Sequence, residues 1–562
     1  MDLKEELKPL LKGELHDDAA ALDAASRDAS LFEVHPRLVV APADAKDICA
    51  IVEYINKHPD QELSVTPRSA GTDMSGGPLT ESIVLDMLPH FNKVIKVGDG
   101  WAETEPGVFY RDFEKETLKK DLLLPCYTAS RELNTMGGMV ANNSGGEKSL
   151  TFGKTENFIE ELHMVLADGK EYVVKPLNKK ELADKMKLDG FEGDLYRDMY
   201  HLIESHYDKI KAAKPHVSKN SAGYFLWNVW DRETGVFDLC KLIAGSQGTL
   251  GVVTKVKFRL VKPKPHSRLL VIFLANFNNL GDLVNEVLEF KPESFESYDD
   301  HTLKLAIRFA PEMAKAMKGS MFGLALDFIP DAFTVMQMGR LPKMVLMAEF
   351  TADTEEEADA TAKAAQERIA HRNLHTLTTR SEHDGKKYWT VRRESFSLLR
   401  HHIKEKHTAP FIDDTAVLPS QLPEFLPALD AIMAKYDLIY TIAGHIGDAN
   451  FHIIPLMDLA DPKTQDIIPQ LSREVYDLIY KFHGTITAEH GDGMIHGPFL
   501  KGMYGEQIFG LFEQTKKIFD PKNIFNPGKK IQSKLTYSMH HFIDDSHILS
   551  DEKTRWAAPK KA

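Results

Sequence analysis

Three glycine-rich clusters in the first half of the chain limit the folds that it can adopt. They read PRSAGTDMSGG from Pro67, TMGGMVANNSGG from Thr135 and GSQGTLG from Gly245. Glycine allows positive φ and close approach of the backbone to a ligand, and successive exposed N–H groups form a cradle for an anion. None of the clusters has the spacing of a P-loop or of a GxGxxG turn. One cluster would favour a tight turn, but three, separated by strand-like segments, indicate several loops around a large phosphate-bearing ligand.

The segments between the clusters alternate between strand-like and helix-like patterns. Residues 45–59 carry apolar side chains at helical spacing, whereas 63–67, 82–87 and 101–108 have the composition of strands. The second cluster is expected to be a turn region, followed by a strand that ends at the hairpin signal ADGKEY. After the third cluster, a long β-branched strand leads to a proline-marked boundary near residue 265. Strands that alternate with helices predict an α/β or α+β domain.

The length of the chain requires more than one domain, because 562 residues exceed what a single hydrophobic core supports. Beyond residue 265, strand-like and helix-like segments alternate again, and an amphipathic helix in the last part stops at a Pro/Asn turn. We therefore expect a first domain over 1–265 with a Lys-rich helical surface insertion at about 180–215, a second α+β domain over 266–490, a C-terminal segment over 491–534 and a polar, His-rich tail over 535–562.

The composition excludes several classes of protein. A formal charge of −14 gives no indication of the basic surface that nucleic-acid binding requires. In so acidic a protein, an anionic substrate would need local positive charge from a metal or a buried arginine. Three widely spaced cysteines exclude a disulfide framework and a cysteine-ligated iron–sulfur cluster within this chain. The charged segment MDLKEELKPLLKGEL is not a secretory signal, and no apolar run approaches the roughly 18 residues of a spanning helix. We therefore expect a cytoplasmic protein, either free or bound peripherally at the inner face of the membrane.

Two segments near the end of the second domain contain residue types that bind metals. GHIGDANFHIIPLM from Gly444 contains His445 and His452, and TITAEHGDG places Glu489 beside His490. With 24 histidines in the chain a single one has no special meaning, but these are flanked by more small residues than a plain strand or helix contains. Two imidazoles and one carboxylate leave coordination positions open, as in catalytic metal sites. The spacing alone leaves both a metal site and a chance arrangement open.

In this order the motifs resemble those of the vanillyl-alcohol oxidase (p-cresol methylhydroxylase, PCMH) superfamily, in its branch of D-lactate dehydrogenases and glycolate oxidase subunits. The first cluster is similar to the family's pyrophosphate loop, PRGGGTSLSGG, and the other two are similar to its second and third FAD loops. GHIGDANFH, AEHGDG and FDPKNIFNPGK resemble its carboxy-terminal hallmarks, and the resemblance extends from about residue 26 to residue 530. It implies an α+β fold, in which a two-subdomain PCMH-type FAD-binding domain joins a ferredoxin-like cap that binds substrate. A C-terminal helical segment would return to the FAD domain.

The resemblance also implies FAD held without a covalent bond, because the first loop lacks the histidine through which some members tether the flavin. Backbone N–H groups would hold the cofactor, so the replacement of two family glycines by Ser69 and Ala70 should change little. The residues that the resemblance assigns to FAD are Pro67, Arg68, Ser69, Ala70, Gly71, Thr72, Asp73, Ser75, Gly76 and Gly77 in the first loop, Thr135, Gly137, Gly138, Ala141, Asn142, Asn143 and Ser144 in the second, Gly245, Gly248 and Val252 in the third, and Asn526 near the flavin ring.

For the metal-ligand pattern, the resemblance implies that His445, His452 and Glu489 bind a divalent metal (zinc, manganese or iron) and that His490 is the general base. Ala449 stands where the family often has glycine. Oxidation of a 2-hydroxy acid removes a proton from oxygen and a hydride from Cα. A metal on the hydroxyl would lower its pKa, the base would accept the proton, and flavin N5 would accept the hydride.

The substrate carboxylate is assigned by resemblance to Arg392, which lies three residues after Trp389 in the family's W-x-x-R pattern. Arg393 is expected on a solvated helix face. Relatives that act on D-2-hydroxyglutarate carry a further lysine before an LP turn, whereas FIDDTAVLP has Asp413 and Asp414, which would repel a second carboxylate. This favours D-lactate, oxidised to pyruvate, as the substrate.

Several alternatives stay open. The chain could be a D-2-hydroxyglutarate or glycolate dehydrogenase subunit, or a non-redox FAD enzyme that resembles alkyl-dihydroxyacetonephosphate synthase. Electrons would pass to an acceptor other than NAD: a quinone, a cytochrome, an electron-transfer flavoprotein, an iron–sulfur subunit or oxygen. Family frequency favours a dehydrogenase over an oxidase. We expect no nucleic-acid partner and no transmembrane segment.

Overall fold

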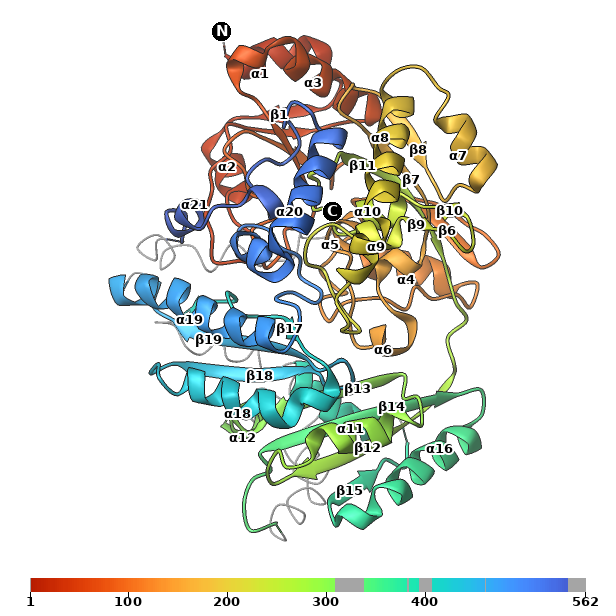
Figure 1. The fold of residues 1–562 in the computed structure, drawn as a ribbon, viewed down its shortest axis with the longest axis vertical. Coiled ribbons are helices and arrows are strands. Elements are labelled where there is room, and N and C mark those ends of the chain that lie inside the picture. Colours follow the sequence, from red (N-terminus) through yellow and green to blue (C-terminus); the bar gives the residue numbers. More distant parts are fainter. Residues whose placement is uncertain (1, 309–337, 382–383, 394–406, 460, 544–562) are drawn as a thin grey trace.

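The structure, a computed structural model, combines helices and sheets in two bodies (Figure 1). The upper body contains residues up to 259 and the C-terminal residues from 491, and the lower body is built around the largest sheet, over residues 266–481. The α+β fold predicted from the sequence is confirmed. Within the described residues, no helix combines the length and the apolar composition of a membrane span. The structure describes residues 2–308, 338–381, 384–393, 407–459 and 461–543.

A four-stranded sheet at the top of the molecule leads into the first glycine cluster, which follows its strand β3. The helix predicted at 45–59 is α3 (Ala45–Lys57), which begins where the Asp44 side chain accepts two backbone N–H groups of the first turn. Its apolar stripe is buried against the sheet core. The sheet order is β1 (Glu14–His16), β2 (Leu38–Ala41), β4 (Ile83–Asp86) and β3 (Val65–Arg68), with β2, β4 and β3 parallel, and the short helices here are α1 (Leu3–Leu7) and α2 (Ala19–Ala25).

The other two clusters precede strands β7 and β11 of a five-stranded antiparallel sheet. The second cluster forms helix α5 (Met136–Asn142) where the sequence predicted a turn. The helix forms because Thr135 Oγ1 accepts the N–H of Gly138 at 3.4 Å, and it ends where Asn143 adopts the left-handed conformation. The sheet order is β5 (Val94–Val97), β6 (Trp101–Thr104), β11 (Val252–Arg259), β7 (Ile159–Val165) and β8 (Glu171–Val174), with α4 (Tyr110–Leu118), α6 (Ser149–Phe152) and α10 (Cys240–Ile243) nearby in the chain, and β9 (Trp230–Asp231) and β10 (Val236–Phe237) forming a separate pair.

The segment predicted as a helical surface insertion is helical but partly buried. It contains α7 (Lys179–Lys185), α8 (Phe191–Ser205) and α9 (Tyr207–Ala212). Helix α8 buries one face, including Tyr196 and Met199, and packs against the C-terminal helix α20. The segment therefore belongs to the core of the upper body rather than to its surface alone.

The lower body begins with the βαββαβ topology of a ferredoxin-like fold, as the resemblance implied. Strands β12, β13, β14 and β15 pair in the spatial order β15-β12-β14-β13, all antiparallel, and the sheet continues through β18, β19 and β16. Helix α16 packs on β12 and β14 and covers one face of the sheet (Figure 1). The strands are β12 (His266–Leu274), β13 (Ser294–Asp299), β14 (Met344–Ala352), β15 (His375–Thr378), β16 (His407–Thr408), β17 (Thr415–Ala416), β18 (Ile439–His445) and β19 (Asn450–Met457), and the helices are α11 (Leu280–Leu288), α12 (Asp300–Arg308), α16 (Glu355–Arg368), α18 (Leu422–Met433) and α19 (Pro462–Lys481).

The chain finally returns to the upper body through α20 (Leu500–Phe519), as expected for the C-terminal segment. Lys516 on this helix donates to the carbonyl oxygens of Thr249 and Phe525, each at 2.7 Å, which ties the helix to the third glycine cluster. After α21 (Leu535–Met539), Phe542 pairs with Phe32 of the N-terminal segment. The rest of the predicted tail lies outside the described residues.

Candidate functional site

A cavity of about 960 Å³ lies between the two bodies. The three glycine clusters line it from the upper body, and β18, β19 and the segment at 489–490 line it from the other side. Cofactor pockets have volumes of about 300–1,000 Å³, so the cavity is large enough for a large cofactor. In its glycine-rich wall, the first and third loops pack so closely that a Cβ on Gly248 would lie 2.6 Å from Pro67 Cγ. A roomy cavity with loops of this kind fits FAD.

Most residues that the sequence assigned to FAD line this cavity. Six do not line it, and two of these, Asn526 and Ser75, hold the loops through side-chain hydrogen bonds. Asn526, for example, is buried, and its Nδ2 donates to the carbonyl oxygens of Gly77 at 2.8 Å and Gln247 at 2.7 Å. The lining residues are Pro67, Arg68, Ser69, Ala70, Gly71, Thr72, Asp73, Gly77, Thr135, Gly137, Gly138, Ala141, Asn142, Ser144 and Gly248, and the six others are Ser75, Gly76, Asn143, Gly245, Val252 and Asn526.

Gln247, which the sequence analysis did not single out, joins the glycine loops to the C-terminal segment. Its Nε2 donates to Ser75 Oγ at 2.9 Å, and its backbone N–H donates to Ala141 O at 2.9 Å. Its Oε1 accepts the backbone N–H groups of Asp492 at 3.0 Å and Gly493 at 2.9 Å. A polar residue inside the GSQG turn was the one signal that could have indicated this role.

His445 and His452 lie on a β-hairpin, and the small residues between them make its tight turn. β18 ends at His445 and β19 begins at Asn450 after one turn of 3₁₀ helix. Glycine is needed at Gly444, because a Cβ there would lie 2.1 Å from Asn450 O. Ala449 has φ +46°, a left-handed conformation that costs a non-glycine residue roughly 1–2 kcal/mol. The hairpin places the two rings 5.3 Å apart, centroid to centroid.

These two rings and Glu489 could hold a metal. His445 Nε2 lies 3.5 Å from Glu489 Oε2, and one ligand atom from each of the three residues lies within 4.8 Å of the others. His445 Nδ1 is hydrogen-bonded to Glu296 Oε1 at 2.6 Å, and His452 Nδ1 to Asp413 Oδ1 at 3.2 Å. A carboxylate at Nδ1 orients the ring and leaves Nε2 for a metal. The donor set therefore fits a divalent cation with open coordination positions.

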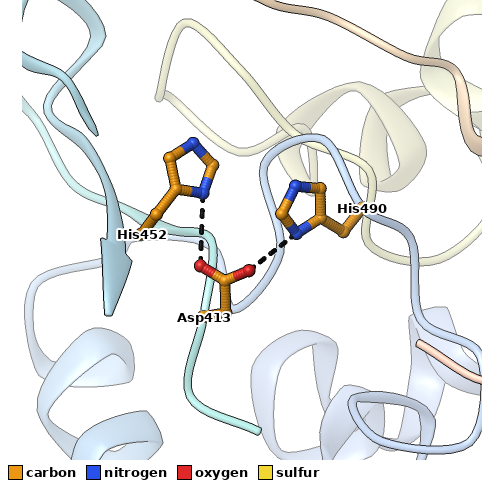
Figure 2. Close-up of side chains that lie close together, drawn as sticks. All are labelled: Asp413, His452 and His490. Atoms are coloured by element: carbon orange, nitrogen blue, oxygen red, sulfur yellow. Dashed lines mark hydrogen bonds and ion pairs between the residues drawn. The ribbon is translucent and has the colours of Figure 1, made fainter. Parts of the chain in front are cut away.

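Asp413 and Asp414 both hold the segment that contains the expected base. Asp414 Oδ2 accepts the backbone N–H groups of Glu489 at 2.6 Å and His490 at 2.7 Å. Asp413 Oδ2 lies 2.9 Å from His490 Nδ1 (Figure 2). Asp414 is fully buried and does not line the cavity. Asp414 therefore fixes the loop rather than contacting a substrate, whereas Asp413 lines the cavity, so the predicted repulsion of a second substrate carboxylate stays a prediction.

The neighbouring residues Arg392 and Arg393 both line the cavity, and each forms an ion pair with a glutamate. Arg392 Nη2 lies 3.3 Å from Glu296 Oε2, on the same carboxylate that orients a ligand ring. Arg393 donates to Glu147 through Nε at 2.7 Å and Nη2 at 2.5 Å, and its guanidinium lies 4.8 Å from the centroid of the Trp389 ring. The side chain of Arg393 is 38% exposed, which agrees with the predicted solvated position, and it also gives the buried Glu147 carboxylate a bidentate partner across the two bodies.

Lys219, which no motif singled out, is the buried cation of the site. Its Nζ donates to Glu489 Oε1 at 2.7 Å, lies 3.2 Å from Asp448 Oδ2 and donates to Gly146 O at 3.3 Å. The residue is 1% exposed. Because Lys219 occupies Oε1, the Oε2 atom of Glu489 is the one left near His445.

Nearby carboxylates favour the charged form of two of the imidazoles, His490 and His445, when no metal is bound. Burial alone would lower the pKa of His490, but Asp414 and Asp413 raise it to about 10. Burial also acts against the charge on His445, yet the Glu296 carboxylate raises the pKa of this ring to about 9. A metal takes the unprotonated nitrogen, so loading this site should release protons.

Two family models place the chain in the class of FAD-linked oxidases. The family "FAD linked oxidases, C-terminal domain" matches residues 263–530, and the family "FAD binding domain" matches residues 36–175. The chain belongs to the vanillyl-alcohol oxidase/PCMH superfamily of FAD-linked oxidases, which confirms the resemblance of its motifs.

Three curated relatives share about a quarter of its residues. A D-2-hydroxyglutarate dehydrogenase of Pseudomonas putida is 26% identical over 525 residues, which cover 92% of this chain and 50% of that protein. The glycolate oxidase subunit GlcD of Bacillus subtilis is 26% identical over 544 residues (94% and 96%). A D-lactate dehydrogenase of Archaeoglobus fulgidus is 25% identical over 501 residues (88% and 91%). The chain thus spans about half the length of the first relative and most of the other two.

Solved structures share the fold at lower identity. An alkyldihydroxyacetonephosphate synthase superposes with a TM-score of 0.64 at 15% identity, covering 93% of this chain and 84% of that chain. A substrate-bound p-cresol methylhydroxylase superposes with a TM-score of 0.64 at 14% identity, covering 95% and 96%. These similarities establish the fold alone.

Proposed function

We propose that this protein oxidises a D-2-hydroxy acid to the 2-oxo acid with FAD as the hydride acceptor, and that D-lactate is its preferred substrate. One observation carries the proposal: the three ligand side chains, His490 and Arg392 line the same cavity as the glycine loops. The names of the relatives, which include D-lactate and D-2-hydroxyglutarate dehydrogenases, support the reaction class. The electrons then leave to a non-NAD acceptor such as a quinone, a cytochrome, an electron-transfer flavoprotein or an iron–sulfur subunit.

The described side chains have separate roles in this reaction. Arg392 binds the substrate carboxylate, since a guanidinium has five donors and its pairing with Glu296 leaves some of them available. In its neutral form His490 accepts the hydroxyl proton at Nε2, because Asp413 Oδ2 lies 2.9 Å from its Nδ1 and favours the proton there. The ligand trio would hold a divalent metal, which would supply the charge that lowers the pKa of the substrate hydroxyl, and the glycine loops would hold FAD, which would supply the two-electron oxidant.

The charges of the cavity favour a small monocarboxylate. Arg68 donates to two backbone carbonyls, Arg131 lies 3.8 Å from a glutamate, and Arg393 is held by Glu147. Among the described residues that line the cavity, each arginine already has a hydrogen-bond or ion-pair partner, and only Arg392 lies beside the ligand trio through its contact with Glu296. The Asp413 carboxylate in the lining would also oppose a second substrate carboxylate.

Anaerobic reduction of the flavin tests the proposal directly. D-lactate should bleach the flavin absorbance faster than D-2-hydroxyglutarate, glycolate or L-lactate, and a chelator should abolish the reduction until Zn²⁺ or Mn²⁺ is returned. No bleaching with any D-2-hydroxy acid would refute the reaction class, and faster bleaching with D-2-hydroxyglutarate would refute the preferred substrate.

Two variants test the assigned roles. His490→Ala should keep FAD and metal but reduce the flavin about 10²–10⁴-fold more slowly. His452→Ala should lose metal and turnover together. His163→Ala, which removes a ring bonded to Glu161 on β7 and absent from the cavity lining, is the control and should behave as wild type. A wild-type reduction rate in either site variant would remove that residue from the mechanism.

A further inference from the structure

One carboxylate contacts both an expected metal ligand and the expected base. Asp413 is 1% exposed, with Oδ1 3.2 Å from His452 Nδ1 and Oδ2 2.9 Å from His490 Nδ1 (Figure 2). The two rings are stacked, with centroids 5.2 Å apart and 22° between their planes. The third ring, that of His445, has its own carboxylate in Glu296.

The backbone holds Asp413 at this place. β17 pairs with β19 through Thr415 and Phe451, which brings the preceding residues alongside His452. Asp414 has φ +69°, in the left-handed region that Asp tolerates better than most residues. The chain therefore turns between the two aspartates, so that Asp414 bonds the backbone of the 487–490 segment while Asp413 contacts the rings.

We propose that Asp413 is a positioning residue that keeps a proton on Nδ1 of both His452 and His490, so that both Nε2 atoms are available to the substrate site. This deepens the proposed function and rests on it. A carboxylate has no proton to donate, so a ring nitrogen that is hydrogen-bonded to it, as His452 Nδ1 is, or paired with it at 2.9 Å, as His490 Nδ1 is, must carry the proton, whether the ring is charged or neutral. The Nε2 of His452 is then free for a metal, and the Nε2 of His490 is free for the hydroxyl proton.

Asp413→Asn separates this role from simple packing, because the amide has the same shape but one acceptor and one donor group. Its NH₂ group can only donate, so one of the two rings must present a bare Nδ1 and carry its proton on Nε2. If His452 is that ring, the affinity for Zn²⁺ should fall about 10- to 100-fold. If His490 is that ring, flavin reduction by D-lactate should slow by up to about 10⁴-fold with little change in KM.

The test uses the FAD-loaded full chain labelled with ¹⁵N-histidine and saturated with Zn²⁺. The wild type should show Nδ1–H signals for both rings, assigned with His452→Ala and His490→Ala, and Asp413→Asn should lose one of them. Asp413→Glu keeps two acceptor oxygens and should retain both signals. Asp492→Asn, an equally conservative change in a buried ion pair with Lys530 that contacts no imidazole, is the control and should leave both signals in place. Calorimetric titration with Zn²⁺ gives the second readout.

Several outcomes would overturn the proposal. Unchanged Nδ1–H signals, Zn²⁺ affinity and reduction rate in Asp413→Asn would do so, and so would the absence of either signal in the wild type, which needs no variant to fold. Complete loss of Zn²⁺ binding in both Asp413→Asn and Asp413→Glu would make Asp413 a ligand instead. If the spectra and Zn²⁺ titrations behave as expected while no hydroxy acid reduces the flavin, the proposed function fails and the positioning role stands.

Discussion

Replacement of Lys219 by methionine should destabilise the metal-free protein. The Lys219 ammonium lies 2.7 Å from Glu489 and 3.2 Å from Asp448, and all three residues are buried. Methionine keeps most of the side-chain volume but leaves two buried carboxylates without their cation. Removal of one partner of a buried ion pair costs about 3–5 kcal/mol, so the free energy of unfolding should fall by about that amount.

A bound divalent cation should reverse part of this loss. Two unit charges about 4 Å apart interact by about 4 kcal/mol at an effective dielectric constant of about 20, so Lys219 repels a cation placed beside Glu489. Its removal should strengthen Zn²⁺ binding and enlarge the stabilisation that Zn²⁺ confers on the folded protein. The same substitution is thus expected to have opposite effects on the metal-free protein and on metal affinity.

Thermal unfolding with and without saturating Zn²⁺ measures both effects. Since 1 kcal/mol shifts Tm by about 2–4 °C in domains of 150–250 residues, the metal-free Tm of Lys219→Met should fall by roughly 6–20 °C. Lys516→Met is the control, because Lys516 is a buried lysine that donates to Thr249 O and to Asp520 Oδ2, neither of which lines the cavity. It should lower Tm without changing the increment due to Zn²⁺. Equal Zn²⁺ increments in Lys219→Met and wild type would refute the electrostatic reasoning.

Three other changes test the loops and a buried histidine. Gln247→Ala removes the hydrogen bonds that join Ser75 to the C-terminal segment, and the Kd for FAD, measured by fluorescence, should rise about 10- to 100-fold; an unchanged Kd would contradict this. Gly493→Ala puts a Cβ 2.2 Å from a backbone oxygen of Ser75 and should lower Tm and FAD content, whereas Gly510→Ala, with nothing within 4 Å, should not. Burial lowers the pKa of His496 to about 4, below its ordinary 6.5, so the unfolded chain binds more protons between these values. The associated stability, about 3 kcal/mol, should be complete above pH 6.5 and lost as the pH falls to 4, and denaturant unfolding should show a flatter pH profile in His496→Gln.

The parts of the fold that local chemistry specifies were predictable from the sequence. The glycine clusters and the apolar stripe of α3 each depend on residues close together in the chain. The metal-binding residue types at His445, His452 and Glu489 could also be seen in the sequence. The structure brings one ligand atom of each within 4.8 Å of the others. Local pattern was less reliable at the second cluster, because a capping threonine converted a glycine-rich stretch into helix α5.

The sequence by itself determined which side chains could bind a cofactor, a metal and a proton, and in what order they come. Only the tertiary structure decided which neighbouring group forms a hydrogen bond or an ion pair with each of these side chains. Glu296 reaches His445 across 149 residues of chain, and Lys219 reaches Glu489 across 270. Such pairs depend on how strands and loops from different parts of the chain pack, and a buried charge must find a partner wherever the fold provides one. For this reason the ion pair of Arg393 with Glu147 was not predicted from the sequence, and Lys219 and Gln247 were missed.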